Sequence, residues 1–450
     1  GALTAASIGD YEVSTGSLTF AAGSSAAQTF TVTASSDVTA EPLEGLKVSL
    51  LDDSLNVLGT KILGISDNSA TAAQTFTLSS TTNTVTGGVD NMTGAGGDDT
   101  FNATIAASLT SADIIDGGAG TDTLNARYSV TAASTQTATV SNVEIVYVDT
   151  DDGDANDAHT TTFDLATFSG VTQAWAYNND SDATNQDILN ISNIPLGTTV
   201  GVKGGDANSN NTFTFLFTTA LTDTATLALD TAKSNLITIA GIEAITVSAS
   251  GKSTIDELAT TSALTLNVNA TGKTVLTNID DATRVVDASG STGAVTIGGV
   301  GTYSKGLTIT GGSGNDTIKM GTTLDKLDTI VGGEGIDTLL TSADANTAGM
   351  GAGVSGFEVF GLSTTDASDT MRMDTIDVSE FYLVNADSND NGTAFTTTFT
   401  KADNGDNITI YAASDDSDDN AEGTLLTVTH AVDSSSDDIS VTLAGIGASA

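Results

Sequence analysis

The sequence predicts an all-β protein that combines parallel β-solenoid segments with β-sandwich domains. Three observations lead to this prediction: short alternating runs of apolar and polar residues, a turn motif rich in glycine and aspartate, and an internal repeat that contains this motif. Alternation with period two is typical of strands. Repetition of a short-strand unit is typical of solenoids, which bury their core between stacked units.

The alternating runs are a few residues long, rich in Thr, Val and Ile, and bounded by Gly, Asn or Asp. β-Branched residues fit the surface of a sheet, and the bounding residues favour turns. Convincing amphipathic helices are absent, and a helical turn or two is expected only in 161–168 and 371–382. The clearest strand candidates are 264–270, 294–297, 306–310 and 423–429.

Length and composition are those of a globular protein. With 450 residues, of which 39% are apolar, the chain has room for roughly two to four domains. No run reaches the ~18 apolar residues of a membrane helix. The N-terminus has neither a basic segment nor a long apolar one, so no secretory signal peptide is expected there. We therefore expect a processed product or a fragment of a longer protein.

Acidic residues dominate the charge. The 57 Asp and Glu outnumber the 13 Lys and Arg, and the net charge is −44. Most of the acids are Asp, which prefers turns to helices. Such a charge excludes nucleic acid and anionic lipid as direct partners. Because Asp clusters beside Gly and Asn, bound cations are favoured over two alternatives, solubility and adaptation to high salt.

Cysteine is absent, and the chain has only two His. Disulfides, thiolate metal sites, thiol catalysis and a His-rich zinc site are therefore excluded. A chain without Cys suits an exported protein that folds outside the cell without oxidative help.

An internal repeat joins two distant parts of the chain. The run DIIDGGAGTDTL at 113–124 is followed by VEIV at 143–146, and the run DTIVGGEGIDTL at 328–339 is followed by FEVF at 357–360. A third copy of the second motif is GIEAITV at 241–247. This duplication supports a solenoid, because one unit alone could not bury its core.

Four segments fit the pattern Gly-Gly-x-Gly-x-Asp-x-apolar: 94–101, 117–124, 311–318 and 332–339, the first with Ala95 in place of the second Gly. This pattern is the calcium-associated nonapeptide repeat of β-solenoids. The motifs form two pairs, and the spacing within each pair is close to one solenoid coil. We expect each pair to stack and to hold one or more calcium ions; a metal-free β-turn is the alternative.

The pattern assigns a role to each position. The glycines allow a tight turn whose carbonyls point inward, and the Asp adds a hard anionic oxygen of the kind that Ca²⁺ prefers. The apolar residues after the Asp should face the core; they are Phe101, Leu124, Ile318 and Leu339. The predicted calcium ligands are Gly94, Gly96, Asp98, Asp99, Gly117, Ala119, Asp122, Gly311, Ser313, Asp316, Gly332, Glu334 and Asp337.

Weaker acidic loops are further candidates. Residues 387–392 begin like an EF-hand loop, with Asp387 and Asn389 as candidate ligands, but Thr398 stands where such a loop needs Glu. Calcium in an irregular loop and a solvated turn both stay open there, as they do for 149–157 and 415–422.

The repeats resemble the RTX class of proteins exported by type I secretion and, within it, bacterial S-layer proteins. The resemblance is carried by 117–124, by VSNVE at 140–144 and by VVDASG at 285–290, and it covers about 75–450. It implies β-solenoid and β-sandwich parts, lattice or filament assembly, a calcium requirement and a C-terminal secretion signal. The tail at 439–450 has the pattern of a strand.

The segment 1–75 resembles a Calx-beta sandwich, through 10–11, 16–20, 30–32 and 46–50. The opening strands of that sandwich are missing. Either the chain is truncated, or a strand from a neighbouring subunit completes the sheet. The residues that this resemblance nominates as calcium ligands are Asp37, Glu41 and Glu44.

The sequence argues against an enzyme. His159 and His430 are isolated, so the H-E-x-x-H motif is absent, and so is the nucleophile elbow G-x-S-x-G. Aromatic residues that would stack on sugars are scarce, and Trp175 and Tyr177 lie in an alternating run that predicts a strand.

These observations predict a calcium-dependent extracellular structural protein that self-assembles into a surface layer or filament at the cell surface. The alternative is a calcium-rigidified adhesin or surface-binding module of a larger RTX protein. The expected partner is the chain itself, with donor-strand contact between subunits and a surface polysaccharide as further candidates. The expected domains are a partial Calx-beta-like sandwich at 1–75, RTX solenoid segments at 76–150 and 301–360, a β-rich segment at 151–300 and a C-terminal β domain at 361–450.

Overall fold

The computed structural model describes most residues between 73 and 363, and strands on either side of that range. Within it the gaps are 79–88, 105–107, 128–133, 137, 150–159, 179–186, 206–210, 219–222, 261, 281, 300–305, 322 and 342–352. Outside it the described residues are 4–5, 11–13, 32–34, 44–51, 57–65, 369–372, 380–384, 396–402, 407–411, 425–430 and 439–444.

The secondary structure of the described residues is β-strand, which confirms the predicted fold class. The helical turn expected in 161–168 is wrong, because β14 (Thr160–Asp164) covers the start of that segment and no helix follows it there. In 371–382, β33 (Asp369–Arg372) and β34 (Glu380–Val384) cover the two ends, and 373–379, where the helical turn could still lie, falls outside the described residues. Three consecutive Thr in β14 favour an extended backbone. In the described ranges no helix is long and apolar enough to cross a membrane.

The chain divides into two units, which are considered separately. Unit 1 comprises 1–153 and 161–174, and unit 2 comprises 154–160 and 175–450. The finer division into five domains stays a prediction.

Unit 1 contains strands of 2 to 9 residues. They are β1 (Thr4–Ala5), β2 (Tyr11–Val13), β3 (Val32–Ala34), β4 (Glu44–Leu51), β5 (Val57–Ile65), β6 (Thr75–Thr77), β7 (Asn91–Thr93), β8 (Thr100–Ala103), β9 (Ile114–Asp116), β10 (Thr123–Arg127), β11 (Ser134–Gln136), β12 (Thr139–Ser141), β13 (Ile145–Asp149) and β14.

Pairing in unit 1 is parallel from β6 onward. Strands β6, β8, β10 and β13 form one sheet in that order, and β7, β9 and β12 form another. Nearer the N-terminus, β4 pairs antiparallel with β5, β2 pairs antiparallel with β3, and β1 pairs parallel with β4. The Calx-beta-like sandwich expected over 1–75 is not confirmed by these strands and stays a prediction.

Unit 2 contains strands of 2 to 8 residues. They are β15 (Gln173–Asn178), β16 (Ile188–Ile194), β17 (Thr199–Gly204), β18 (Thr212–Phe217), β19 (Thr224–Asp230), β20 (Lys233–Ala240), β21 (Ala244–Ser250), β22 (Ser253–Ala259), β23 (Thr265–Ala270), β24 (Thr274–Leu276), β25 (Val285–Asp287), β26 (Val295–Ile297), β27 (Thr308–Thr310), β28 (Thr317–Gly321), β29 (Thr329–Val331), β30 (Thr338–Thr341), β31 (Val354–Ser355), β32 (Val359–Ser363), β33, β34, β35 (Thr396–Ala402), β36 (Asn407–Tyr411), β37 (Leu425–His430) and β38 (Ser440–Ala444).

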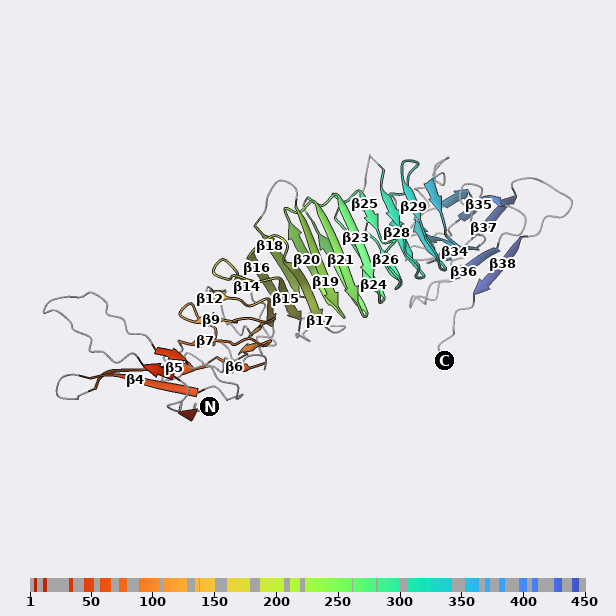
Figure 1. Cartoon of the computed structure of the whole chain (residues 1–450). Coiled ribbons are helices and arrows are strands. Elements are labelled where there is room, and N and C mark those ends of the chain that lie inside the picture. The colour runs from red at the N-terminus through yellow and green to blue at the C-terminus, as the bar shows by residue number, and fades with distance from the viewer. Residues whose placement is uncertain are drawn as a thin grey trace, which may run out of the picture. The chain divides into compact units, whose positions relative to one another are not determined.

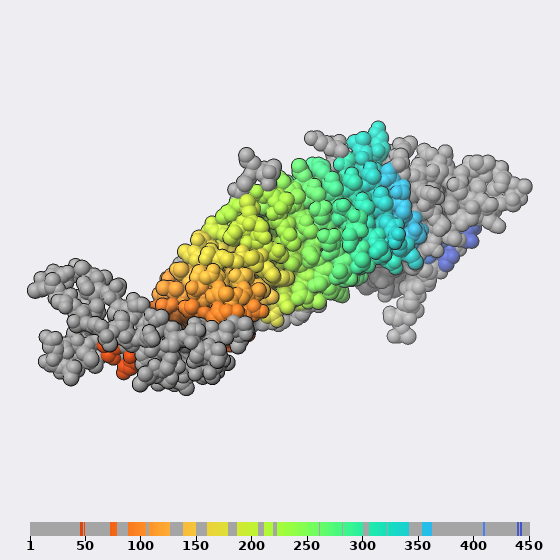
Figure 2. Space-filling model, viewed as in Figure 1, coloured from red at the N-terminus to blue at the C-terminus, as the bar shows by residue number. Residues whose placement is uncertain are grey.

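These strands form a parallel β-solenoid. Odd-numbered strands from β15 to β31 lie in one sheet and even-numbered strands from β16 to β38 in the other, so up to β32 each coil gives one strand to each sheet (Figure 1). Beyond β32, the odd-numbered strands β33, β35 and β37 form a separate parallel sheet. Thr265 pairs with Val285 and Val285 with Thr308, so that each of these intervals is one coil. Figure 2 shows successive coils side by side on the surface, in the order of their colours.

The core of unit 2 lies between the two sheets. In the odd-numbered sheet Leu227, Val247 and Val268 are aligned in register and fully buried. Alternate residues of the same strands face outward, as in β21, where Ser248 is exposed. Period-two alternation in the sequence therefore becomes a continuous apolar column across the coils.

A column of glycines sets the spacing at one corner of the coils. Gly251, Gly272, Gly293, Gly314 and Gly335 follow one another at equal intervals along the chain. A Cβ on Gly293 would lie 2.5 Å from the carbonyl oxygen of Gly272, and one on Gly335 would lie 2.5 Å from that of Gly314. Because real Cβ atoms do not approach so closely, a side chain at these positions would push the coils apart.

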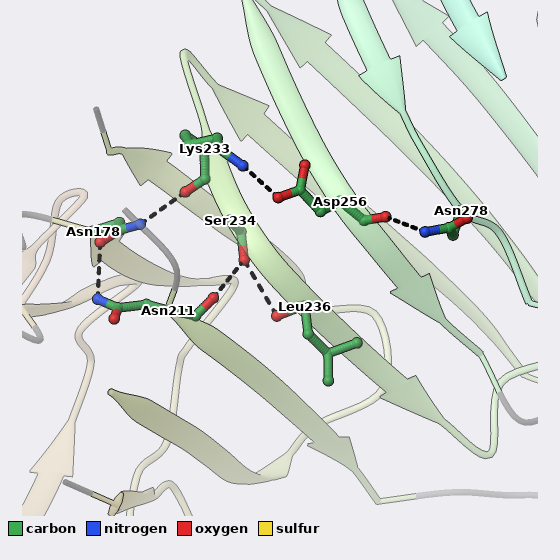
Figure 3. A network of polar contacts seen from close by, with 7 residues as sticks. All are labelled: Asn178, Asn211, Lys233, Ser234, Leu236, Asp256 and Asn278. Carbon is green, nitrogen blue, oxygen red and sulfur yellow. Dashed lines mark hydrogen bonds and ion pairs between the residues drawn. The ribbon is translucent and has the colours of Figure 1, made fainter. Parts of the chain in front are cut away.

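Polar and charged side chains link several coils of unit 2 (Figure 3). The Asn178 amide donates to the carbonyl of Lys233 at 2.7 Å, and the Asn211 amide donates to the Asn178 side chain at 3.1 Å. The Lys233 ammonium forms an ion pair of 2.6 Å with Asp256. These contacts give hydrogen-bond partners to polar groups between the coils. Without partners, such buried groups would destabilise the fold.

We expect Ile245→Ala to lower the free energy of unfolding by about 2–5 kcal/mol, because it leaves a cavity in the core. Ile245 is 0% exposed in β21. Urea unfolding of the full chain in calcium measures this change. The control is Ser248→Ala on the outer face of the same strand, which should change stability by less than about 0.5 kcal/mol. Equal losses in the two variants would contradict this description of the core.

Candidate calcium site

Each predicted motif pair stacks. Thr100 pairs with Thr123 in unit 1, and Thr317 pairs with Thr338 in unit 2, both in parallel register. The residue after each motif turn faces the core as predicted, and the four buried side chains are Phe101, Leu124, Ile318 and Leu339. The spacing within each pair is thus one coil, as the sequence predicted.

The aspartates of unit 1 form a ladder across the coils. Asp122 Oδ1 accepts a hydrogen bond of 2.7 Å from the backbone N–H of Asp99. Asp99 Oδ1 accepts one of 2.7 Å from the N–H of Gln74 in the preceding coil. Each carboxylate therefore satisfies a backbone donor of the coil before it.

Unit 2 repeats this ladder. Asp337 Oδ1 accepts from the N–H of Asp316 at 2.7 Å, and Asp316 Oδ1 accepts from the N–H of Val295 at 2.7 Å. All four aspartate side chains are buried. The duplication seen in the sequence is thus a duplication of one geometry.

The second carboxylate oxygen distinguishes the two coils of a pair. In the first coil it accepts a backbone N–H from earlier in the same turn: Asp99 Oδ2 from Ala95 at 2.8 Å, and Asp316 Oδ2 from Gly312 at 2.6 Å. In the second coil, Oδ2 of Asp122 and Oδ2 of Asp337 are buried without a hydrogen-bond partner in the described part of the chain. A buried anionic oxygen without a partner is costly, so each pair has one oxygen suited to a cation.

Backbone conformation explains this difference. Gly118 and Gly333 occupy in the second coils the positions of Ala95 and Gly312, and their φ angles are +95° and +116°. The N–H of Gly118 donates to Asp116 Oδ1 at 3.2 Å and not to Asp122. A Cβ on either glycine would collide with a carbonyl oxygen of the preceding coil, so only glycine fits there.

The electrostatics also favour a cation. Burial raises the pKa of Asp122 to about 6, and the charges of Asp99, Glu144 and Asp98 add to the rise. Burial likewise raises the pKa of Asp337 to about 6, with contributions from Asp316 and Glu358. These carboxylates lie among other negative groups, and a bound divalent cation would offset that repulsion.

Carboxylates alone do not make a metal cage. Among the described residues, no group of three or more His, Cys, Asp or Glu side chains could hold a metal ion. A site at the motif turns therefore needs backbone carbonyl oxygens beside the carboxylate, as hard Ca²⁺ sites commonly use. The carbonyls of Gly94 and Ala95 face Gly118, and those of Gly311 and Gly312 face Gly333.

Most of the other predicted ligands in the motif turns form hydrogen bonds between neighbouring coils. Asp98 is exposed, and its Oδ1 accepts the N–H of Thr121 at 2.8 Å. Gly96 lies at the exposed tip of its turn. The backbone N–H groups of the remaining predicted ligands donate to backbone carbonyl oxygens of neighbouring coils, at 2.7–2.9 Å. The pairs are Gly94 to Asp116, Gly117 to Ser141, Ala119 to Ala95, Gly311 to Val331, Ser313 to Ser291, Gly332 to Ser355 and Glu334 to Gly312.

Several predicted ligands lie outside what the structure describes. Asp37, Glu41, Asp387 and Asn389 fall outside the described residues, as do most of the acidic loops at 149–157 and 415–422. Glu44 is the first residue of β4, and its side chain is not described. Calcium binding by these residues stays a prediction.

Two buried aspartates were missed by the sequence analysis as structural groups. Asp113 accepts the N–H groups of Asp90 at 2.8 Å and Thr110 at 2.6 Å. Asp328, which is its counterpart in the repeat, accepts those of Leu307 at 2.8 Å and Asp325 at 2.7 Å. Both carboxylate oxygens are thus satisfied by backbone donors. The signal in the sequence is that each residue opens one copy of the repeated run.

The chain matches the family model of the RTX calcium-binding nonapeptide repeat, in four copies within 109–127, 308–319 and 325–353. No curated protein matches the chain. The chain therefore carries RTX calcium-binding repeats on a parallel β-solenoid; its cofactor is Ca²⁺, and the several copies imply several ions. The turn at 94–101 lies outside the matched residues, although its stacking is that of the 311–318 turn.

We expect the double variant Asp122→Asn and Asp337→Asn to lower calcium affinity by about 10-fold or more, because it removes the charge on the unpartnered oxygens. Asn retains the Oδ1 acceptor for the preceding coil. Isothermal titration and a count of bound calcium measure the effect. The control is Asp113→Asn, which should lower stability but leave the calcium count unchanged, since both Asp113 oxygens already accept backbone donors. Unchanged affinity in the double variant would contradict the assignment.

The raised pKa values predict the pH dependence. The pKa of about 6 in the folded, calcium-free protein lies above the ordinary value of 3.8, so the folded state keeps these protons to higher pH than the unfolded state does. The contribution of these two carboxyl groups to the free energy of unfolding of the calcium-free protein should be greatest below pH 3.8 and should fall as pH rises through about 6. Calcium affinity should fall as pH drops below about 6, because protons compete for the same oxygens.

Thermal unfolding in metal-free buffer from about pH 4 to about pH 7.5 measures the stability, and titration over the same range measures the affinity. The Asn double variant should lose this part of the pH dependence. Identical profiles for the variant and the unchanged protein would contradict the attribution to Asp122 and Asp337.

Proposed function

We propose that this protein is a secreted, calcium-dependent structural subunit that assembles with copies of itself into a surface layer or filament outside the cell. The observation that carries this proposal is the repeated motif pair, in which a buried carboxylate oxygen has no hydrogen-bond partner among the described residues. A coil stack with such groups depends on bound cations for its stability, and calcium binding to the folded state adds stability by mass action.

The RTX repeats support the secreted location. Proteins with these repeats are generally exported by type I secretion and are extracellular. Calcium is abundant outside cells, where weak sites fill readily. The absence of Cys and the net charge of −44 agree with export and with a high demand for cations. The finer identity, an S-layer protein, is part of the proposal.

The architecture supports a structural role. The RTX β-roll is typically a structural rather than a catalytic fold. Within the described residues, β38 has one strand neighbour, β36, and its other edge is open to a further strand. Exposed strand edges pair readily with strands of other chains, so this edge suits contact between copies. A donor strand at the N-terminal segment is a second candidate contact.

The second candidate function is an adhesin or surface-binding module, which uses the same calcium-rigidified fold. Adhesins carry a distinct ligand-binding part, and a surface polysaccharide would be its ligand. The divergence between the two copies of the repeat favours a lattice or filament subunit, because adhesins commonly use many near-identical tandem domains.

We expect the purified protein to form ordered sheets or filaments in calcium, and to lose them on chelation, because the motif coils loosen when their carboxylates lose the cation. Negative-stain imaging, with bound metal counted in parallel, measures both properties. The double variant Asp122→Asn and Asp337→Asn should assemble poorly in calcium, whereas Asp113→Asn that remains folded should assemble. Monomers that bind several calcium ions and never assemble would favour the adhesin or binding module.

A further inference from the structure

We infer that Glu144 and Glu358 are positioning residues for calcium binding. Each holds the backbone of the second aspartate of a motif pair, Asp122 or Asp337, in an arrangement that we call a clasp. This inference rests on the calcium dependence in the proposed function and is independent of assembly. It concerns the second motif of the internal repeat, VEIV and FEVF, to which the sequence pattern alone assigned no role.

The clasp in unit 1 holds the backbone of Asp122 from both sides. Glu144 Oε2 accepts the N–H of Asp122 at 2.8 Å. The carbonyl oxygen of Asp122 accepts the N–H groups of Glu144 at 3.2 Å and of Ile145 at 2.9 Å. Donor and acceptor of one aspartate are thus both bound by the following coil.

The clasp in unit 2 has the same geometry. Glu358 Oε2 accepts the N–H of Asp337 at 2.7 Å, and the carbonyl oxygen of Asp337 accepts the N–H groups of Glu358 at 3.2 Å and of Val359 at 3.0 Å. The aspartate held in each unit is the one whose Oδ2 is buried without a hydrogen-bond partner among the described residues.

Strand register explains why the residue is glutamate. Ile145 pairs with Thr123, so Glu144 lies level with Asp122, where a further motif coil would place its aspartate. Its own coil has VSNV before it and lacks the glycine-rich turn. The glutamate side chain is longer by one methylene and reaches the N–H that an aspartate of a further motif would have satisfied. Glu358 lies level with Asp337 in the same way, because Val359 pairs with Thr338.

The clasp bears on calcium because it fixes the residue that presents the free oxygen. Groups that orient a metal ligand commonly change metal affinity about 10–100-fold when they are removed. Here the oriented groups are Asp122 and Asp337, and no other side chain is seen to accept their N–H groups among the hydrogen bonds of the described residues.

A third clasp provides an internal control. Glu243 Oε2 accepts the N–H of Asp223 at 2.7 Å, and the carbonyl oxygen of Asp223 accepts the N–H groups of Glu243 at 3.2 Å and of Ala244 at 3.3 Å. The residues before Asp223, TTALT at 218–222, contain no glycine, so this clasp follows no calcium motif. Its loss should affect stability without affecting calcium.

The test, made on the 450-residue chain, separates the length of the glutamate side chain from its charge. Glu144→Asp with Glu358→Asp keeps the charge and shortens the side chain, whereas Glu144→Gln with Glu358→Gln keeps the reach and an acceptor oxygen. We expect the Asp pair to weaken calcium binding about 10–100-fold and the Gln pair to retain most of the affinity. Isothermal titration and the count of bound calcium measure these outcomes, with folding of each variant checked in calcium.

The matched controls are Glu243→Asp and Glu243→Gln, which should leave calcium affinity and count unchanged. If the Asp pair bound calcium normally, or if the Gln pair lost as much affinity as the Asp pair, the positioning role would be overturned. An equal loss in Glu243→Asp would also overturn it, because the effect would then be general destabilisation. Failure of the unchanged protein to assemble would contradict the proposed function alone, since calcium binding is measured independently of assembly.

Discussion

A stack of parallel coils must satisfy the backbone donors that its turns leave outside the sheets. Strands within such a stack pair on both sides, but the corners between them do not continue the ladder, and buried N–H groups there need another acceptor. In this protein a side chain of the following coil supplies it. Asp122 does so for Asp99, and Glu144 does so for Asp122. Most other features of the coils follow from how this requirement is met.

The same requirement is met in two chemical ways. In the middle of unit 2 neutral hydroxyls serve: Ser253 Oγ accepts the N–H of Ala232 at 3.1 Å, and Ser291 Oγ accepts that of Ala270 at 3.0 Å. In the motif turns carboxylates serve, and each brings a charge into a buried place. Carboxylates also serve at some corners outside the motif turns, as Asp113, Asp328 and Glu243 do. The motif turns differ from these corners because Asp122 and Asp337 each keep one oxygen without a hydrogen-bond partner among the described residues.

The sequence predicted what is encoded locally and repeated. Motif spacing predicted the stacking of the coils, and the apolar residue after each aspartate predicted the core, because both depend on positions within one coil. It did not predict which aspartate of a pair keeps a free oxygen, since Ala95 and Gly118 differ in backbone conformation although both follow a motif glycine. Nor did it predict that Asp113 binds Asp90 or that Glu144 binds Asp122, because those contacts join residues about one coil apart without any shared local pattern.

The glycine column at 251, 272, 293, 314 and 335 restricts how the length of this protein can change. An insertion at the column itself would place a side chain against the carbonyl of the coil before it. Elsewhere in the coils the length varies, as the unequal intervals from Thr265 to Val285 and from Val285 to Thr308 show. Gain or loss of an entire coil keeps each glycine of the column next to the glycine of the neighbouring coil. Duplication or deletion of a whole coil is therefore a change in length that leaves the column intact during evolution, whereas smaller changes in length must fall away from this corner.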